Sequence, residues 1–153
     1  MSHPAACVPG TLLARAHGRL APGEAFAGHL TPTEAHRLVE RGEAVLVDVR
    51  TRPEWEYVGH VPGAPLVEWR AYGAGSPNPD FVRALERVAP REATVLFLCR
   101  SGVRSIAAAQ TAAQAGWPQA FNVLEGFEGD LDEAGRRGSR GGWRQAGLPW
   151  RQT

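Results

Sequence analysis

The chain has 153 residues, of which 43% are hydrophobic and 22% charged, and its 17 basic and 16 acidic side chains leave a formal net charge of +1. This length and composition are typical of one ordinary globular domain and exclude an intrinsically disordered chain over most of the length. The charge balance argues against a protein that mainly binds nucleic acid or an anionic membrane, and no apolar run is long enough to span a bilayer. All 17 basic residues are Arg, which excludes lysine Schiff-base and lysine general-base chemistry.

The first 22 residues are rich in Pro, Gly, Ala and Arg without sustained periodicity. We therefore expect residues 1–22 to be a loosely ordered extension and residues 23–153 to be a single domain. No basic region followed by an apolar core is present, so we expect no signal peptide and predict a cytoplasmic location. The two cysteines, Cys7 and Cys99, are too few for a secreted disulfide framework and form no Cys-x-x-Cys pair. We expect neither a metal site nor a cofactor.

The first regular elements expected after this extension are a helix and a strand. Thr31 is the expected N-cap, Pro32 the first helical residue and Glu34 the acidic partner of a capping box, and Gly42 ends this helix. The apolar, β-branched run at 44–49 predicts a strand buried on both faces. A short helix and a short strand are then expected at residues 53–56 and 66–68.

The second half of the chain repeats the alternation of helices and strands. After a loop at 70–79, the expected elements are a helix from about residue 79, a strand at 94–98, a helix at 105–115 and a strand at 120–124. Short apolar strands that alternate with helices predict a parallel α/β sheet covered on both faces. Ligands of such sheets bind beyond the carboxyl ends of the strands, and Cys99 follows the strand that ends at Leu98.

The loop after this strand carries the candidate chemistry. Backbone N–H groups in a turn that opens a helix converge into an anion-binding cradle, and the helix N-terminus adds about half a positive charge. Arg100 and Arg104 add full charges, and Gly102 allows a tight turn. These features favour the thiolate of Cys99 over the thiol, which predicts a nucleophilic cysteine. The predicted substrate-binding residues are Arg100, Ser101, Gly102, Val103, Arg104 and Ser105.

Two substrate classes suit a thiolate in such a cradle, a phosphate ester and a sulfane sulfur donor. The cysteine phosphatase pattern has five residues between Cys and Arg and usually a His before the Cys. Here Arg104 follows Cys99 after four residues, and Leu98 precedes it. A loop that is one residue shorter encloses a smaller space, better matched to one sulfur atom than to a phosphoryl group. The spacing therefore favours sulfur transfer.

The chain resembles the rhodanese family, the single-domain sulfurtransferases, over about residues 24–150. Four stretches in this order carry the resemblance: Leu46-Val47-Asp48-Val49-Arg50 with Glu54-Trp55-Glu56, Gly59-His60-Val61-Pro62-Gly63-Ala64, Cys99-Arg100-Ser101-Gly102-Val103-Arg104-Ser105, and Gly142-Trp143-Arg144-Gln145-Ala146-Gly147-Leu148-Pro149. The resemblance implies a three-layer α/β fold around a five-stranded parallel sheet with helices on both faces.

The resemblance also implies the reaction. The Cys99 thiolate takes the outer sulfur of thiosulfate, releases sulfite and passes the sulfur to cyanide or a thiol. The resemblance also suggests that Arg100 favours thiosulfate, since the related mercaptopyruvate enzymes tend to have a small residue at this position. Asp48 and Arg50 match the family's Asp-x-Arg segment and are expected to form a supporting ion pair. The chain differs from the shortest members by residues 1–22 and by an Arg- and Gly-rich stretch at 129–141, and either is a place for partner specificity.

Three functional hypotheses follow. The first is a thiosulfate sulfurtransferase that acts through a Cys99 persulfide, with a small-molecule sulfur donor, a thiol or cyanide acceptor, and room for a protein donor or acceptor. The second is a sulfur-carrier or sensing module of the same fold with poor turnover. The third and least favoured is a small-anion phosphatase or arsenate reductase. His60 is interpreted as part of a turn rather than as a general base, and a sulfur-relay role for Cys7 is the minority interpretation.

Overall fold

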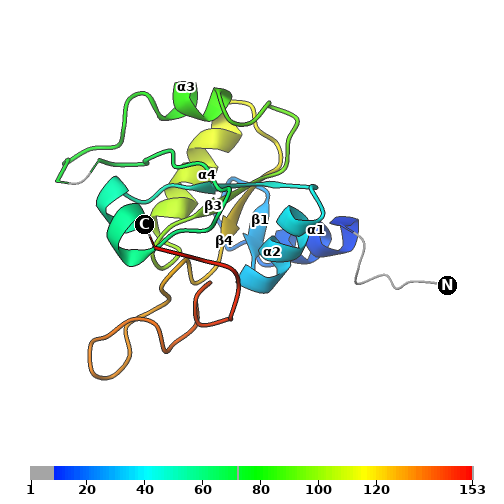
Figure 1. Cartoon of the computed structure of the whole chain (residues 1–153). Helices are drawn as coiled ribbons and strands as arrows, with labels where there is room; N and C mark the ends of the chain where they lie inside the picture. The colour runs from blue at the N-terminus through cyan, green and yellow to red at the C-terminus, as the bar shows by residue number, and fades with distance from the viewer. Residues whose placement is uncertain (1–8, 72, 153) are drawn as a thin grey trace.

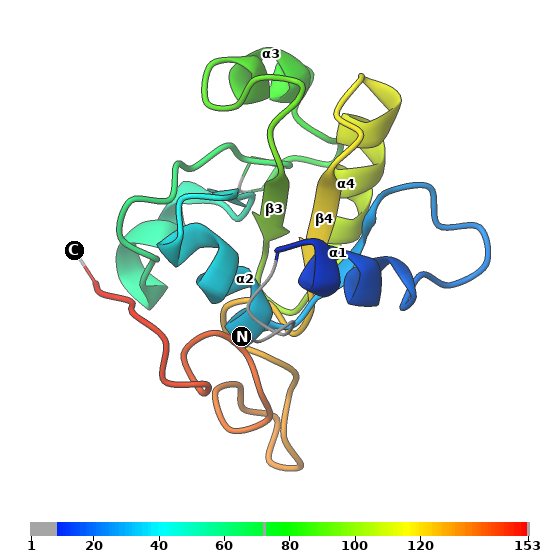
Figure 2. The same cartoon turned by 90° about the vertical axis from the view of Figure 1, so that its right-hand side faces the viewer.

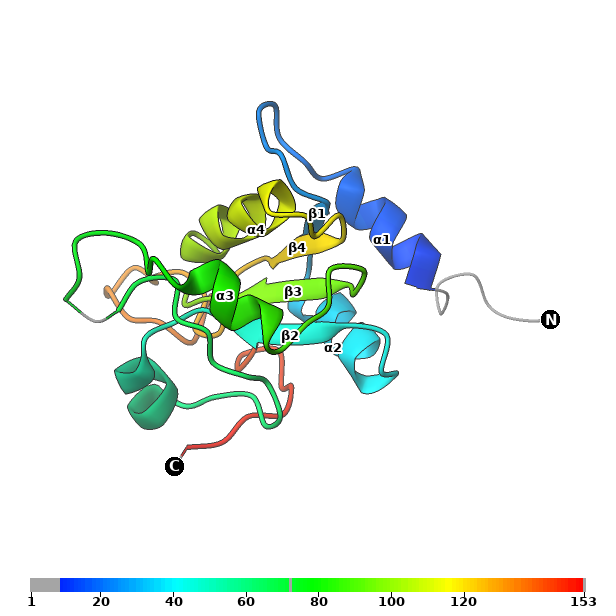
Figure 3. The ribbon, with the colours of Figure 1, turned by 90° about the horizontal axis from the view of Figure 1, so that it is seen from above.

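The structure is a computed structural model that describes residues 9–71 and 73–152. Within these residues the sheet has four strands in the order β1–β4–β3–β2, as Figure 3 shows. All neighbouring strands are parallel, so their carboxyl ends share one edge of the sheet. The strands are β1 (Gly28–Leu30), β2 (Val45–Asp48), β3 (Val95–Leu98) and β4 (Ala120–Val123).

Helices cover both faces of the sheet, which confirms the predicted α/β architecture. They are α1 (Pro9–His17), α2 (Pro32–Glu40), the π-helix η2 (Glu54–Val58), α3 (Phe81–Glu86) and α4 (Arg104–Gln114). Residues of α3 and α4 form one hydrophobic core with the sheet, and residues of α1 and α2 form a second. Figure 1 shows α4 and α2 on opposite sides of the strands, so the fold has three layers.

The period-two alternation of β3 links these two cores. Val95 and Phe97 are buried in the core with α3 and α4, whereas Leu96 and Leu98 are buried in the core with α1 and α2. Cys99 continues the alternation and is buried on the side of Phe97. The strand register therefore fixes the face of the sheet on which the sulfur lies.

The predicted start of α2 is confirmed in detail. The Thr31 side chain accepts a hydrogen bond from the Glu34 amide at 3.2 Å, and the Glu34 carboxylate accepts one from the Thr31 amide at 2.9 Å. Both bonds satisfy N–H groups that the first turn of a helix leaves without partners. The sequence therefore fixes the position of α2 locally.

The prediction of a short strand at residues 66–68 is wrong, because this segment makes only one isolated parallel bridge, between Asp48 and Leu66. The Asp48 amide donates to the Pro65 carbonyl at 2.9 Å, and the Val67 amide donates to the Asp48 carbonyl at 2.8 Å. Pro65 has no N–H to donate and so shortens the ladder that a strand would need. The sheet in the described residues therefore has four strands rather than five.

The segment expected to be a loosely ordered extension contains a packed helix. Leu12 and Ala16 of α1 are buried in the core that α2 shares with the sheet. The following β1 was not predicted either, because its three residues form no apolar run. Cys7 lies outside the described residues, and the proposed domain boundary after residue 22 stays a prediction. In the described residues, no helix is long and apolar enough to cross a membrane.

Candidate active site

The carboxyl ends of β2, β3 and β4 place three chain segments side by side. They are the Asp48–Arg50 segment after β2, the loop from Cys99 to Arg104 after β3, and residues 124–129 after β4. Figure 2 shows the long segment after β4 gathered at this end of the sheet. The predicted location beyond the strand ends therefore brings the Asp-x-Arg segment and the cysteine loop to the same edge.

Two polar groups face the sulfur of Cys99, one from the loop and one from the first turn of α4. The Gly102 amide donates a hydrogen bond to Sγ at 3.1 Å, and the Ser105 hydroxyl lies 3.1 Å from the same atom. Gly102 has a φ of +99°, a conformation that side chains rarely adopt, and its N–H is turned inward. The Cys99 residue is 1% exposed, so the sulfur lies beneath the loop surface with an amide aimed at it.

The segment after β4 supports the loop from below. The Phe127 amide donates to the Cys99 carbonyl at 2.7 Å, and the Glu128 amide donates to the Arg100 carbonyl at 2.9 Å. Gly126 sits so close to the loop that a Cβ atom there would lie 2.5 Å from the Cys99 carbonyl oxygen. Residues 126–128 therefore fix the backbone of the cysteine loop, and only glycine fits at the closest approach.

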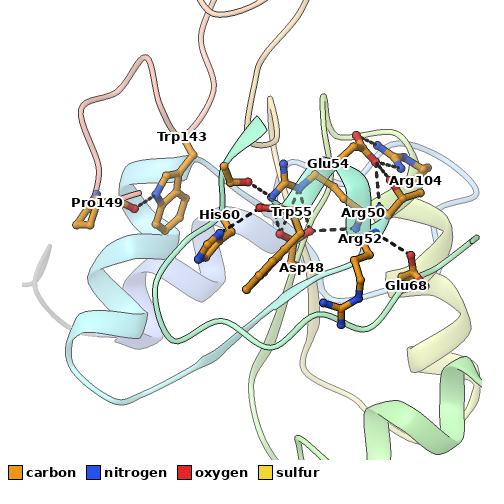
Figure 4. Close-up of polar contacts among 12 residues, drawn as sticks. Asp48, Arg50, Arg52, Glu54, Trp55, His60, Glu68, Arg104, Trp143 and Pro149 are labelled. Atoms are coloured by element: carbon orange, nitrogen blue, oxygen red, sulfur yellow. Dashed lines mark hydrogen bonds and ion pairs between the residues drawn. The ribbon is translucent and has the colours of Figure 1, made fainter. Parts of the chain in front are cut away.

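Arg104, at the start of α4, faces Glu54 of η2, as Figure 4 shows. Its two terminal nitrogens donate to the two Glu54 carboxylate oxygens at 2.8 and 2.9 Å. Burial by itself would raise the pKa of Glu54, but the hydrogen bonds from Arg104 and Thr51 and the charge of Arg104 lower it to about 2. The hydrogen bonds to Glu54 also raise the pKa of Arg104, and the site therefore holds a charged pair at neutral pH.

The expected ion pair between Asp48 and Arg50 is present and fully buried. Arg50 Nη2 donates to Asp48 Oδ2 at 2.7 Å, and Nε donates to Oδ1 at 3.0 Å. Nη2 also donates to the Gly59 carbonyl at 2.7 Å, and the guanidinium carbon lies 4.3 Å from the centre of the Phe127 ring. The pair thus ties the end of β2 to the segment before His60 and to the residues that support the cysteine loop.

An arginine-rich cavity of about 500 Å³ lies beside the loop. Its charged lining residues are Glu54, Arg70, Arg100, Arg104, Glu128 and Arg137. Arg137 reaches it from the Arg- and Gly-rich stretch at 129–141, where its side chain also donates to the Gly129 carbonyl at 2.8 Å. Four arginines against two carboxylates make this cavity suited to an anionic ligand.

The predicted substrate-binding residues of the loop differ in exposure and in what they contact. Arg100 is exposed and lines the cavity with Arg104, whereas Gly102 and Ser105 are buried against the sulfur. Ser101 is half-buried, and Val103 is 71% exposed and is not among the residues that line the cavity.

His60 is packed as the sequence interpretation expected. Its ring stacks on Trp55 with the ring centres 3.7 Å apart, and Nδ1 lies 3.1 Å from the Trp55 carbonyl oxygen. Its backbone pairs with that of Arg151. His60 therefore holds η2 and the C-terminal segment together.

Two parts of the site were missed from the sequence. Glu54 lies in one of the four stretches that carry the family resemblance, but nothing in the sequence indicated that it pairs with Arg104. A chain of polar residues behind Cys99 was also missed, although Asn122 is a polar residue inside the apolar run at 120–124 and could have indicated it. In the described residues, no three His, Cys, Asp or Glu side chains lie together in a way that would hold a metal ion.

The geometry defines a class of protein, an α/β protein in which a loop amide donates to a buried cysteine sulfur at the carboxyl edge of a parallel sheet. The model of the rhodanese-like domain family matches residues 31–133 of the chain. These residues are more than half of the chain, and the protein belongs to this family.

Individual relatives agree with this assignment. The structure of Rv0390 from M. tuberculosis is similar with a TM-score of 0.75 and 47% sequence identity, over 84% of this chain and 99% of that one. The RP600 homolog of Rickettsia rickettsii, an uncharacterized protein, is 35% identical over 115 residues, which cover 74% of this chain and 87% of that protein. The thiosulfate sulfurtransferase GlpE of Actinobacillus succinogenes is 28% identical over 120 residues, which cover 78% of this chain and 86% of that protein.

Proposed function

We propose that the protein is a sulfurtransferase that takes sulfane sulfur from thiosulfate or a similar donor and carries it as a persulfide on Cys99. The Cys99 thiolate attacks the outer sulfur of thiosulfate, the S–S bond of the donor breaks, and sulfite leaves with the bonding electrons. A thiol or cyanide then attacks the terminal sulfur of the persulfide and releases the Cys99 thiolate. Each step is a displacement at sulfur and needs no oxidant or cofactor.

The observation that carries this proposal is the contact of the Gly102 amide with Cys99 Sγ at 3.1 Å. A backbone donor aimed at sulfur stabilises a thiolate and, after transfer, a persulfide anion. Arg100 and Arg104 line the adjacent cavity and supply positive charge for an anionic donor. The likeness to the thiosulfate sulfurtransferase GlpE supports the same donor.

Intact mass spectrometry after incubation with thiosulfate tests the proposal. We expect one added sulfur atom, localised to Cys99, and release of sulfite. Cys99→Ser should abolish both and keep the fold, while the matched control Cys7→Ser should retain both. Full sulfite release by Cys99→Ser would overturn the mechanism.

The burial of the sulfur favours a second candidate, a sulfur carrier that is loaded by another protein. Cys99 is 1% exposed, and Arg104 is occupied by Glu54. A carrier would turn over free thiosulfate very slowly but would accept sulfur from a protein persulfide. Steady-state kinetics with thiosulfate and cyanide separates the two, since a sulfurtransferase shows useful turnover with these small molecules alone.

A phosphatase or arsenate reductase is the third candidate and is disfavoured by the six-residue loop from Cys99 to Arg104. Absence of hydrolysis of an aryl phosphate is the expected result. A cytoplasmic location is part of the proposal, because low-molecular-weight thiols that serve as acceptors are abundant there.

A further inference from the structure

A continuous chain of polar side chains leads from the sulfur across the sheet to the far side of β1. Cys99 Sγ lies 3.1 Å from Ser105 Oγ, and Ser105 Oγ lies 2.5 Å from Asn122 Oδ1. The Asn122 side-chain nitrogen lies 3.0 Å from His29 Nδ1, and His29 Nε2 lies 2.7 Å from a carboxylate oxygen of Glu24. Five residues, each from a different element or loop, thus form one linked path.

The middle of this path is closed to water. Ser105, Asn122 and His29 are all buried. A buried polar group without a hydrogen bond is costly, so each group in the path must find its partner within the path itself. The direction of one hydrogen bond therefore constrains the direction of the next.

Glu24 sets this direction at its end of the path. The hydrogen bond from the Ala21 amide lowers the pKa of Glu24, and so do the hydrogen bond and the charge of His29. Glu24 is therefore a carboxylate at neutral pH. A carboxylate only accepts hydrogen bonds, so His29 must carry a proton on Nε2. In the neutral ring Nδ1 is then an acceptor, and Asn122 must present its NH₂ group to it.

The constraint continues to the sulfur. With its NH₂ group on His29, Asn122 presents its oxygen to Ser105, and the Ser105 hydroxyl donates its single proton there. Ser105 then offers a lone pair to Cys99, which suits an S–H donor and repels a thiolate. A neutral His29 therefore matches the resting thiol.

A thiolate requires the opposite direction along the path. The Ser105 hydroxyl must donate to sulfur, the Asn122 amide must turn over so that its NH₂ group faces Ser105, and its oxygen must accept from His29 Nδ1–H. Since Nε2–H remains on Glu24, the ring then carries both protons as an imidazolium. The amide itself passes no proton.

We propose that His29 and Glu24 are positioning residues that act on Cys99 through Asn122 and Ser105. When His29 is neutral, the Ser105 hydroxyl points away from the sulfur and the thiol form of Cys99 is favoured. When His29 is protonated, the hydroxyl points toward the sulfur and the thiolate is stabilised. The thiol releases its proton to solvent, and His29 takes up a proton from solvent, so no net proton is gained or lost. This inference rests on the proposed role of Cys99 as the nucleophile, and it adds a dependence on the charge of a histidine across the sheet.

Other charged groups near the two ends are paired. On the His29 side, Arg19 donates to the His29 carbonyl at 2.9 Å and is bound to Glu34, while His17 Nδ1 lies 3.2 Å from the Ala27 carbonyl oxygen. On the sulfur side, Arg104 attracts a Cys99 thiolate but is bound to Glu54. None of these groups is a member of the path, so we attribute the coupling between His29 and the sulfur to the path.

The test measures the rate of Cys99 alkylation by iodoacetamide from pH 5.5 to 9 in the full chain with the background change Cys7→Ser. In Glu24→Gln the amide is able to donate to His29 Nε2, so a neutral ring with Nδ1–H becomes possible and the thiolate no longer needs an imidazolium. We expect the pH midpoint to move downward and the rate between neutral pH and that midpoint to rise roughly fivefold, the effect of one hydrogen bond regained. His29→Asn keeps an amide near the position of Nδ1 that is free to turn, and it should change the profile in the same sense.

The control is His17→Asn, which replaces a nearby histidine outside the path and should leave the profile unchanged. If the role of His29 is merely structural, His29→Asn will have a lower thermal stability, but the pH midpoint of alkylation will be unchanged in both Glu24→Gln and His29→Asn. This outcome would overturn the proposal. Nitrogen-15 NMR of the unmodified ring provides a second check, because the proposal requires the Nε2–H tautomer in neutral His29 and an Nδ1–H tautomer would contradict it. Sulfur loading from thiosulfate in the same proteins is scored separately, so failure of the proposed function is distinguishable from failure of the coupling.

Discussion

Two arginine–carboxylate pairs lie near the cysteine loop, and they differ in depth. The side chains of Arg50 and Asp48 are 0% and 1% exposed, whereas those of Arg104 and Glu54 are 26% and 18% exposed. The inner pair has backbone and aromatic partners in addition to each other, while the outer pair lines the cavity.

This difference in exposure indicates which pair has a structural role and which is able to bind a ligand. An ion pair without access to water cannot exchange its partner, since either charge left alone would remain desolvated. A pair at a cavity wall is able to exchange its partner, because an incoming anion replaces the carboxylate on the arginine and water solvates the released carboxylate. We therefore infer that Asp48–Arg50 holds the loop in place and that Arg104 exchanges Glu54 for the sulfur donor.

The strongest way to test the inner pair is Arg50→Met. It leaves the Asp48 carboxylate buried and unpaired, which should lower the free energy of unfolding by about 3–5 kcal/mol. Urea unfolding measures this loss. The double variant Asp48→Leu/Arg50→Met removes both charges and should recover most of the stability, and a double variant as unstable as the single one would contradict the explanation by unpaired charge.

Arg104→Ala addresses the outer pair. If Arg104 binds the donor as inferred, this change removes that charge and leaves Glu54 as a negative group in the cavity wall, so kcat/KM for thiosulfate should fall on the order of 100-fold. The free energy of unfolding should fall less than in Arg50→Met, because the Glu54 carboxylate left without its partner is partly exposed to water. Arg104→Lys should recover part of the activity as a point charge, and a stability loss equal to that of Arg50→Met would erase the distinction between the pairs.

Acid pH offers a third comparison, because the pKa of Glu54 is lowered to about 2. The stability that this lowered pKa provides is fully present above its ordinary value near 4.5 and is lost as the pH falls toward 2. The loss attributable to Glu54 should amount to about 2 to 3 kcal/mol, measured by urea unfolding between pH 6 and pH 2. Glu54→Gln should show a flatter pH profile than the unmodified protein, and an equally steep profile would show that Glu54 carries no such stabilisation.

The smallest expected effect is that of Glu54→Gln on substrate binding at neutral pH. Replacing the carboxylate by an amide frees Arg104 and removes a negative charge from the cavity, so KM for thiosulfate should fall by roughly twofold to fivefold with kcat nearly unchanged. Glu43→Gln, an exposed change on the loop before β2, is the matched control. A rise in KM would mean that Glu54 positions Arg104 for binding rather than competing with the donor.

The local parts of the fold were predictable because their causes are local. The capping residues Thr31 and Glu34 define the start of α2, and the apolar runs define β2, β3 and β4. In contrast, β1 has only three residues and depends on its pairing with β4, and α1 depends on burial of Leu12 against the sheet. Neither cause is visible in a window of sequence.

The candidate site divides in the same way. Cys99, Gly102 and Ser105 are close in sequence, and a strand followed by a turn and a helix is enough to predict that they meet. Glu54 and Arg104 are 50 positions apart, and Asn122 and His29 are 93 positions apart. Spacing carries no information about such contacts, and a lone polar residue in an apolar run is the only trace they leave.

The sequence by itself determined α2, β2, β3, α4 and β4, the sharp turn after β3 and the candidate nucleophile Cys99, because each depends on hydrogen bonds and side-chain alternation within a few residues. The tertiary structure decided which arginine is buried and which is available, and which histidine is linked to the sulfur. Those properties depend on desolvation and on the direction of hydrogen bonds between residues far apart in the chain, and both are defined only when the elements have packed.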